Sequence, residues 1–394
     1  MSAVYLQRVG VVCALGDGID AVRAALFAAY DGGLVVTDRH SPGTPLSMGC
    51  VETPLEPWSD EVPARLRSRT NALLASALRP LRAPVAEAAA RYGPHRVAVI
   101  IGSSTAGVGA GQAAMRWHRG QGGWPPGFDY AIQEMGNPAT FAARTLGVCG
   151  PTYGISTACS SGAKALAAGA RLLRGGLADA VVAGGADELC ELTVAGFRAL
   201  ESVSAERCNP LSLHRRGINL GEGAAAFLMS REAGPVRLAG WGETSDAHHM
   251  SAPDPTGQGA MTAMRQALQR AGVQAVDVDY INLHGTATPQ NDAMESLAVA
   301  AVCGTGVPVS STKPLTGHAL AAAGAVEAAL AWCTLVDNPH GSLPPHRWDG
   351  VADPALPRLH VAGQGECLGR AVSWVLSNSF AFGGSNAALL FSSG

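Results

Sequence analysis

The chain has 394 residues, which is enough for a large buried core and for two domains or two halves of one domain. Apolar residues make up 47% of it and charged residues 15%, a balance that excludes intrinsic disorder. The net charge is −3 and the sequence contains no long run of Lys and Arg, so we expect no nucleic-acid partner.

Nine cysteines occur without the paired spacing of a zinc site or a disulfide framework, so we expect no metal and a reducing, cytoplasmic location. The segment Met1–Gly10 lacks the basic and apolar regions of a signal peptide. The longest apolar run, Leu320–Val336, contains Glu327 and is short for a membrane span. It predicts a buried helix, and we expect no membrane partner.

In the first half of the chain, short apolar strands alternate with helices. The strands are predicted at Val9–Leu15, Val97–Gly102, Tyr153–Thr157, Ala180–Ala183 and Ala224–Met229. The helices are predicted from Gly18 to Ala29, over Ala64–Arg79 where Pro80 stops the helix, over Pro138–Leu146, and from Ala163 onward. Thr37–Asp60 is predicted to be a loop, because it is punctuated by Pro and Gly.

A second half begins near Gly234 and Pro235, so we expect domain boundaries at 1–234 and 235–394. Its strands are predicted at Val236–Gly242, Tyr280–Leu283, Val307–Ser310, Ser373–Leu376 and Ala387–Phe391, with a helix over Met261–Ala271. Alternating strands and helices predict an α/β protein, and continuously apolar strands predict a sheet covered on both faces.

An internal repeat supports two similar halves. A shift of 155 residues places Gly162 on Gly317 and Ala163 on His318. At a slightly larger shift, Gly221, Ala224 and Ala225 match Gly384, Ala387 and Ala388. We therefore expect two βα halves that face each other, one with a reactive thiol and the other with histidines.

Cys159 lies between a predicted strand and a predicted helix, among small residues. The unpaired N–H groups at the start of that helix would favour the thiolate, which is the reactive form. The alternative is a buried structural cysteine.

Two histidines and two charged residues in the second half complete a candidate site. His284 and His318, each at the start of a helix or in a Gly-rich loop, are expected to stay neutral and to donate N–H bonds to a developing enolate. Lys313 and Glu327 are expected to pair, because a buried lysine needs a partner. The alternatives are structural histidines and exposed charges.

The glycine-rich loop Phe380–Asn386 is backbone-exposed, and its N–H groups could join that of Cys159 as an oxyanion hole. The alternative is an ordinary glycine hairpin.

Four motifs, in collinear order over nearly the whole chain, resemble the β-ketoacyl-acyl carrier protein synthases, types I and II, of the thiolase-like superfamily. The motifs are Thr-Ala-Cys-Ser-Ser-Gly, His-Gly-Thr-Ala-Thr-Pro-Gln-Asn-Asp, Lys-Pro-Leu-Thr-Gly-His and Asn-Ser-Phe-Ala-Phe-Gly-Gly-Ser-Asn. The resemblance implies a five-layered αβαβα fold of two similar halves and a homodimer or a heterodimer with a related chain. It also implies decarboxylative condensation of an acyl group with malonyl-acyl carrier protein.

The resemblance assigns roles to single residues and implies no bound cofactor, because the substrates travel on the 4'-phosphopantetheine of an acyl carrier protein. Cys159 would accept the acyl group, and His284 and His318 would drive malonyl decarboxylation. The remaining roles are site organisation by Lys313 and Glu327, phosphopantetheine binding by Thr286 and Thr288, an oxyanion amide and gate at Phe382, and a second gating loop at Asp246–Ser251.

Two further groups follow from the same resemblance. The acyl pocket is expected to include Thr105, Phe197, Ile218 and Phe380. Docking of an acidic carrier protein is expected at a basic cluster on one predicted helix, with a fourth contact nearby: Arg65, Arg67, Arg69 and Arg198. The alternative for the cluster is a solvated helix face.

Several positions depart from the family pattern. Ser212 and Arg216 stand where acids are usual, Ile218 stands for an aromatic residue, and Lys164 stands where histidine is common. These changes leave primary fatty acid synthesis and a specialised polyene or polyketide pathway both open.

Two rival functions share the fold. A thiolase would use coenzyme A and a second cysteine near the C-terminus, but Cys367 lies too far upstream for that role. A non-catalytic, chain-length-determining partner subunit would lack the nucleophile, whereas Cys159, His284 and His318 are all present.

Overall fold

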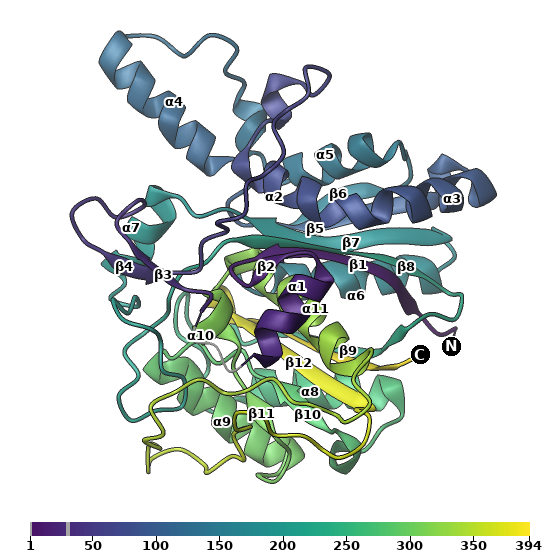
Figure 1. Ribbon diagram of the computed structural model, residues 1–394, viewed down its shortest axis with the longest axis vertical. Coiled ribbons are helices and arrows are strands. Elements are labelled where there is room, and N and C mark those ends of the chain that lie inside the picture. The colour runs from purple at the N-terminus through teal and green to yellow at the C-terminus, as the bar shows by residue number, and fades with distance from the viewer. Residues whose placement is uncertain (1, 29–31) are drawn as a thin grey trace.

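Two equivalent sets of five strands form the centre of the protein, as seen in the computed structural model, which describes residues 2–28 and 32–394 (Figure 1). The first set runs in the order β6-β5-β7-β8-β1 and the second in the order β11-β10-β12-β13-β9. In each set the first three strands are parallel, and the last two are added antiparallel.

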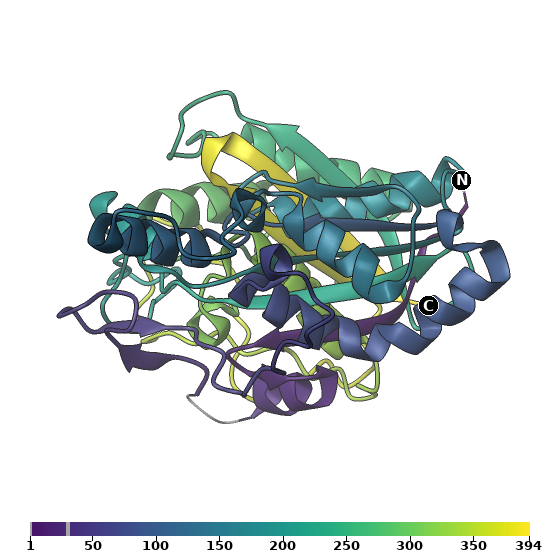
Figure 2. The ribbon, with the colours of Figure 1, turned by 90° about the horizontal axis from the view of Figure 1, so that it is seen from above.

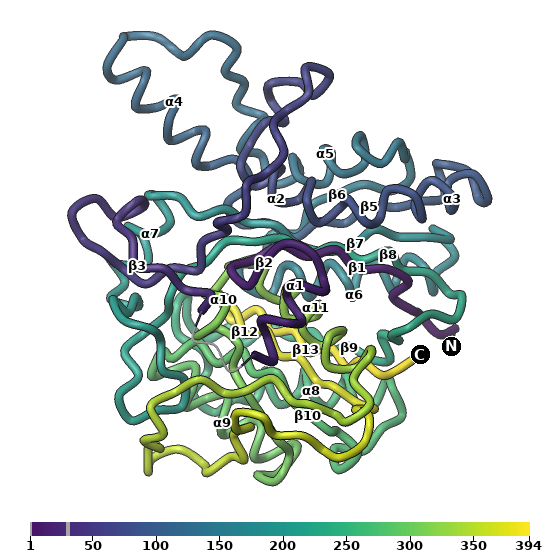
Figure 3. The backbone as a smooth tube through the Cα atoms, in the orientation of Figure 1, coloured from purple at the N-terminus to yellow at the C-terminus, as the bar shows by residue number. Residues whose placement is uncertain are grey.

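The strands of the first set are β1 Tyr5–Cys13, β5 Val97–Gly102, β6 Thr152–Ile155, β7 Ala180–Asp187 and β8 Gly223–Ser230. Those of the second set are β9 Val236–Ser245, β10 Tyr280–Asn282, β11 Val309–Ser310, β12 Trp374–Ala381 and β13 Ser385–Ser393. Short strands β2 (Gly16–Asp17), β3 (Val35–Thr37) and β4 (Leu46–Met48) lie outside them. The sets join where β1 pairs with β9 at Leu6 and Val236, and both chain ends lie on the same side of the molecule (Figure 3).

Helices cover both faces of each set and give five layers (Figure 1), and the outer helices of the first set lie over its strands when the molecule is seen from above (Figure 2). Helices α6 (Ser161–Arg174) and α11 (Ala323–Leu335) lie in the middle, and every residue of α11 is buried. Helices α2 (Arg69–Leu78) and α5 (Asn137–Leu146) cover the outer face of the first set, while α8 (Gln258–Ala271) and α9 (Pro289–Cys303) cover that of the second. The expected αβαβα architecture of two similar halves is confirmed.

The remaining helices are α1 Ile19–Phe27, α3 Arg82–Tyr92, α4 Val108–Gln121, α7 Glu191–Ala199 and the short α10 Lys313–Thr316. Helix α4 projects from the body of the molecule (Figure 1). Within the described ranges, no helix combines the length and apolar character needed to cross a bilayer.

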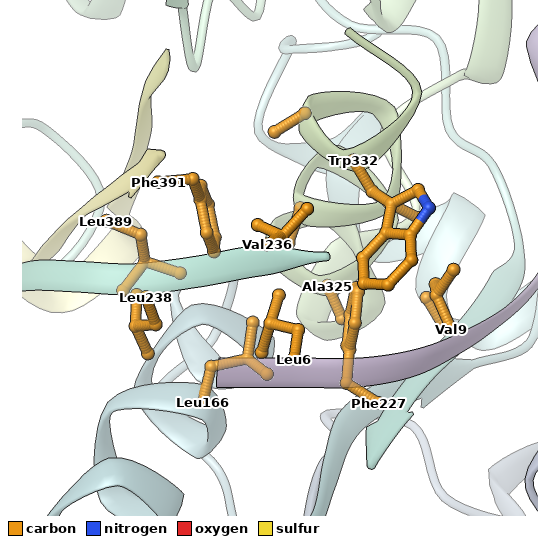
Figure 4. Close-up of a cluster of buried hydrophobic side chains, with 14 of the residues drawn as sticks. Leu6, Val9, Leu166, Phe227, Val236, Leu238, Ala325, Trp332, Leu389 and Phe391 are labelled. Atoms are coloured by element: carbon orange, nitrogen blue, oxygen red, sulfur yellow. The ribbon is translucent and has the colours of Figure 1, made fainter. Parts of the chain in front are cut away.

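The central core is built from both halves. Leu6 and Phe227 of the first set lie beside Leu238 and Phe391 of the second, and Trp332 of α11 packs with them (Figure 4). All five are buried. Burying each such side chain contributes roughly 1.5–3 kcal/mol, so the halves share one hydrophobic core.

Two glycines allow α6 and α11 to touch backbone to backbone. A Cβ on Gly162 would lie 2.8 Å from the carbonyl oxygen of Ala321 and 2.9 Å from the amide of Ala325. A Cβ on Gly324 would lie 2.9 Å from the Cβ of Ala163. The two equivalent helices therefore cross at the starts of their first turns, which brings the two halves of the candidate site together.

The predicted repeat is right in kind, but the 155-residue shift is wrong for these helices. Helix α6 begins at Ser161, so a shift of 155 residues would start its equivalent helix at residue 316. The equivalent helix α11 begins at Ala323, about two helical turns later. A displacement of two turns returns to the same helix face, so small residues match at either shift. Gly162 is equivalent to Gly324 and not to Gly317.

Three other expectations need correction. The helix predicted over Ala64–Arg79 breaks, because the Ser68 side chain accepts the Asn71 N–H and starts α2 anew after a short 3₁₀ turn. Pro80 does not stop the helical path, which continues through another 3₁₀ turn into α3. The loop predicted at Thr37–Asp60 contains β4, and the predicted helix end at Ala29 falls outside the described residues.

Gly162→Val should destabilise the protein by about 1–3 kcal/mol or more, because the new side chain meets backbone atoms that cannot move aside. Gly120→Val is the matched control, since no atom lies within 4 Å of a Cβ placed there. Urea unfolding of both variants checks the prediction, and equal midpoints would contradict the close crossing.

Candidate functional site

Cys159 lies at a tight elbow between β6 and α6. Ala158, just before it, has a φ of 50°, which an L-residue adopts only where the surroundings enforce it. The Ser160 hydroxyl donates to the Thr157 carbonyl at 2.8 Å, and the Thr157 amide donates to the Ser161 hydroxyl at 2.9 Å. These bonds hold the elbow and direct the thiol, which is 5% exposed, toward the second half.

The second half places two histidines beside that thiol. His284 follows β10 and His318 follows α10, and their rings are nearly perpendicular with centroids 5.2 Å apart. The Cys159 sulfur and one nitrogen from each ring all lie within 4.8 Å of one another. The structure thus brings together three side chains that are distant in the sequence.

Glu295, which the sequence interpretation missed, holds the His284 loop. Its carboxylate accepts the amide N–H groups of His284 and Gly285 at 2.8 and 2.7 Å. Burial raises the pKa of Glu295 to about 7 in spite of these two bonds. The spacing of the two acids could have revealed Glu295 in the sequence. Glu295 lies three residues after Asp292 and therefore on the same face of the helix, and Asp292 also turns inward and accepts the Ala287 amide.

Burial keeps both imidazoles neutral, and a buried ammonium beside them adds to the effect. The Lys313 Nζ lies 2.5 Å from Glu327 and 3.4 Å from the Nδ1 of His284. Burial lowers the pKa of His284 and of His318 well below the usual value, and the Lys313 charge lowers both further. Burial raises the pKa of Glu327, while the bond to Lys313 opposes that rise.

The lysine also fixes the tautomer of His284. An ammonium group can only donate, so the Nδ1 of His284 accepts from it and the ring proton is left on Nε2. The expected pairing of Lys313 with Glu327 is present in the structure. A thiol and two imidazoles are also a ligand set that zinc accepts, but the neighbouring ammonium would repel a cation.

Cys159 is buried, and its surroundings act on the pKa of its thiol in opposite directions, while the expectation that the helix start favours the thiolate stays a prediction. Burial raises the pKa of Cys159 to about 11, although the Lys313 charge and the amides of Phe382 and Cys159 all oppose that rise. At neutral pH the proton must therefore leave during the reaction. The His318 imidazole is the available acceptor beside the sulfur, because both ring nitrogens of His284 are already engaged.

The glycine-rich loop approaches the same sulfur. Phe382 follows β12, and its amide, like that of Cys159 itself, points at the Cys159 sulfur. Two amides that converge on one reacting atom form a suitable site for the oxygen of a tetrahedral intermediate. Gly383 and Gly384, with φ of 82° and 74°, provide the turn, and Gly384 accepts the Asp246 amide from the expected second gating loop.

A cavity of about 140 Å³ opens onto these groups. Among the predicted site residues, its lining includes Cys159, Phe197, Ile218, His284, Thr286, Thr288, His318, Phe380 and Phe382. The rings of Phe197 and Phe382 lie 5.6 Å apart across it, and the hydroxyls of Thr286 and Thr288 are 3.0 Å apart.

Thr105 is not part of this lining. Its hydroxyl donates at 2.8 Å to Asp187, which also accepts the amides of Ser104 and Ala321. Asp187 therefore ties the end of β5 to the second half, a structural role that the sequence interpretation missed. The assignment of Thr105 to the acyl pocket stays a prediction.

The three arginines predicted to form a basic cluster on one helix do not share a helix, because Arg65 lies in a 3₁₀ turn, Arg67 follows that turn and Arg69 begins α2. Arg69 makes two bonds to the buried carboxylate of Glu222, and Arg67 donates at 2.7 Å to the Val62 carbonyl. Arg65 and Arg198 are exposed, the latter on α7. Of the four arginines predicted for docking, these two are the ones whose side chains are open to a partner.

The departures from the family pattern have local structural partners in two cases. Ser212 donates to Asp349 at 2.9 Å, and Lys164 lies 2.5 Å from the Ser385 hydroxyl. Ile218 lines the cavity, and Arg216 is exposed.

Comparison with known proteins gives consistent matches. Residues 74–234 match the family model "Beta-ketoacyl synthase, N-terminal domain", and residues 236–347 match "Beta-ketoacyl synthase, C-terminal domain". A 3-oxoacyl-[acyl-carrier-protein] synthase 2 of Rhizobium meliloti is 37% identical over 265 residues, which cover 61% of this chain and 60% of that relative. The chain thus spans less than two thirds of that curated relative.

Two solved structures are similar over the full chain. A chain of the ketosynthase in complex with its chain length factor from Xenorhabdus doucetiae is 40% identical with a TM-score of 0.94, covering 100% of this chain and 98% of that one. A chain of the ishigamide ketosynthase/chain length factor is 26% identical with a TM-score of 0.88, covering 100% and 99%.

Arg69→Ala should lower the free energy of unfolding by about 2 kcal/mol, because it leaves the Glu222 carboxylate buried without its cation. This loss of stability is smaller than the loss expected when one partner of a fully buried ion pair is removed, because the Arg69 side chain is 37% exposed. Arg65→Ala, on the exposed neighbour, is the control and should leave stability within about 0.5 kcal/mol. Similar denaturation midpoints for the two variants would show that Arg69 is free for docking.

Proposed function

Because this chain belongs to the β-ketoacyl synthase family, we propose that it is a 3-oxoacyl-acyl carrier protein synthase, which joins an acyl group to malonyl-acyl carrier protein with loss of CO₂. The observation that carries the proposal is the convergence of the Cys159 sulfur with His284 and His318 within 4.8 Å. The amide of Phe382 beside that sulfur supports it. A thiol, two neutral donors and an oxyanion site are the groups that this reaction requires.

In the first half-reaction, the Cys159 sulfur attacks the carbonyl of an acyl thioester. Its proton passes to the His318 imidazole, and the amides of Cys159 and Phe382 hold the carbonyl oxygen as it gains charge. The bond to the carrier thiol breaks, the carrier takes up the proton, and the acyl group remains on Cys159.

In the second half-reaction, malonyl-carrier loses CO₂. The electron pair of the broken carbon–carbon bond moves into the thioester, and the N–H groups of His284 and His318 stabilise the enolate oxygen. Neutral imidazoles suit this role because they donate a hydrogen bond without giving up the proton. The enolate carbon then attacks the acyl-cysteine, the sulfur leaves as a thiolate that takes a proton from solvent, and a 3-ketoacyl chain two carbons longer departs on the carrier.

Thr286 and Thr288 are proposed to bind the phosphopantetheine arm, since both line the cavity and lie next to His284. Phe197, Ile218 and Phe380 are proposed to line the acyl pocket for the same reason. Carrier docking is proposed at the exposed Arg65 and Arg198. The cytoplasmic location and the division of the chain into two halves at residue 234 both stay predictions.

A specialised polyene or polyketide pathway is favoured over primary fatty acid synthesis by the similarity to two ketosynthase–chain length factor complexes. A partner chain of the same fold is therefore proposed. It would meet an unpaired strand edge, because β6 ends the sheet and Tyr153 on it is 39% exposed. The intact Cys159 site argues that this chain is the catalytic member and not the chain-length-determining one.

Cys159→Gln should abolish condensation while retaining or raising CO₂ release from malonyl-carrier. Glutamine offers a neutral amide in place of the acylated thiol, and decarboxylation depends chiefly on the histidines. His318→Ala should slow decarboxylation about 10²–10³-fold, the typical loss for one preorganised donor. The paired measurement is CO₂ released and 3-ketoacyl product formed for each variant.

Condensation at the unaltered rate by the Cys159→Gln protein would exclude Cys159 as the nucleophile and sink the proposed function. Cys149→Gln, at an exposed cysteine outside the cavity, is the control for nonspecific effects.

Light scattering should give at least twice the 40.1 kDa mass of the chain, either alone or only with the partner chain present. Tyr153→Lys should weaken that association, because it adds a charge to the edge of β6. A monomer with full turnover would contradict the proposed assembly.

A further inference from the structure

Beyond the β12–β13 pairing that closes it at Ala381 and Ser385, the loop that carries the Phe382 amide is held from two sides. On one side the Gly383 amide donates to the Met250 carbonyl, and the Asp246 amide donates to the Gly384 carbonyl, both at 2.8 Å. This neighbouring segment is largely open to solvent, and Met250 is 80% exposed. These bonds tie the loop to another surface loop and do not fix its distance from Cys159.

On the other side, the loop is bonded to the helix that follows the nucleophile. The Lys164 Nζ on α6 lies 2.5 Å from the Ser385 hydroxyl, directly after the two loop glycines. The Ser385 and Ser160 hydroxyls are 3.0 Å apart, and Ser160 donates to the Thr157 carbonyl at 2.8 Å.

The lysine sets the direction of this chain of bonds. Its ammonium group has no lone pair to offer, so it donates to Ser385. The Ser160 hydroxyl lies within donating distance of both the Ser385 hydroxyl and the Thr157 carbonyl, so it links the loop to the elbow. The chain therefore runs from Lys164 to the backbone of the elbow that presents Cys159, and a charged donor strengthens it.

The Phe382 amide depends on such an anchor. Gly383 and Gly384 have no side chains to limit the backbone between Phe382 and Ser385, so the glycine turn does not by itself fix the position of the amide. An oxyanion donor must lie close to one position to act, and a displacement of about 1 Å can cost 10²-fold in rate.

We propose that Lys164 is a positioning residue, which holds the Phe382 amide against the Cys159 sulfur through Ser385 and Ser160. The proposal deepens the proposed function and rests on it for its kinetic readout. Lys164 is half-buried, and burial lowers its pKa while the Glu243 charge opposes that change. The ammonium serves acyl transfer to Cys159, because that step uses the Phe382 amide, and not the decarboxylation step, which uses the histidines.

The test separates the two half-reactions. Lys164→Met should slow transfer of an octanoyl group from octanoyl-carrier to Cys159 at least 10-fold, measured by intact mass in single turnovers. In the Cys159→Gln background, Lys164→Met should change CO₂ release from malonyl-carrier by less than 2-fold. Ser385→Ala should give the same slow acylation, and the double variant should be no slower than either single one.

Two controls keep the test specific. Lys164→Arg retains a charged donor and should restore most of the acylation rate. Arg171→Met removes a cation two turns along the same helix, where Arg171 pairs with Glu243 instead of the loop, and should acylate at the unaltered rate.

A structural readout is independent of the proposed function. Hydrogen exchange of the peptide covering 382–386, measured without substrate, should be faster in Lys164→Met than in the unaltered protein and the Arg171→Met control. Unchanged exchange, an unaltered acylation rate, or an equal loss in both half-reactions would each overturn the positioning role. If no acyl-carrier in a panel of chain lengths acylates the unaltered protein, the proposed function fails, while the exchange measurement still decides whether Lys164 holds the loop.

Discussion

One buried ammonium sets the electrostatics of the site. Lys313 is 1% exposed and lies between the Glu327 carboxylate and the Nδ1 of His284. Removing such a charge from water costs several kcal/mol, which only a close and well-oriented partner repays. The pair with Glu327 supplies that partner. Burial keeps both imidazoles neutral, the Lys313 charge adds to that effect, and its contact with Nδ1 leaves the His284 proton on Nε2. The proposed chemistry depends on donors in this form.

The fold provides the close contact that such a site needs. Gly162 and Gly324 let the two central helices cross at backbone distance, and Asp187 joins the end of β5 to Ala321 of the second half. The thiol and the histidines come from different halves, so their spacing is set by this rigid crossing and not by a flexible loop. The elbow at Ala158 adds backbone strain that the surrounding hydrogen bonds maintain.

Local patterns predict the layers and the candidate residues, while long-range contacts escape them. The strand Val97–Gly102 has the predicted bounds because it is apolar at every position and buried on both faces. Helix α4 was not predicted, since Gly107, Gly109 and Gly111 weaken the helical signal at its start. The raised pKa of Cys159 was also not predicted, because the burial that raises it is created by the second half of the chain. Glu295 and Asp187 act on backbone amides that only the fold brings near them.

The central claim is that Cys159 becomes acylated in this closed, neutral site. The direct measurement is intact mass of the protein after exposure to a panel of acyl-carrier thioesters, followed by peptide mapping of the modified residue. The account predicts one acyl group per chain, on the peptide that contains Cys159, for at least one chain length. Full occupancy elsewhere, or no retained acyl group with any carrier substrate while product still forms, would contradict it.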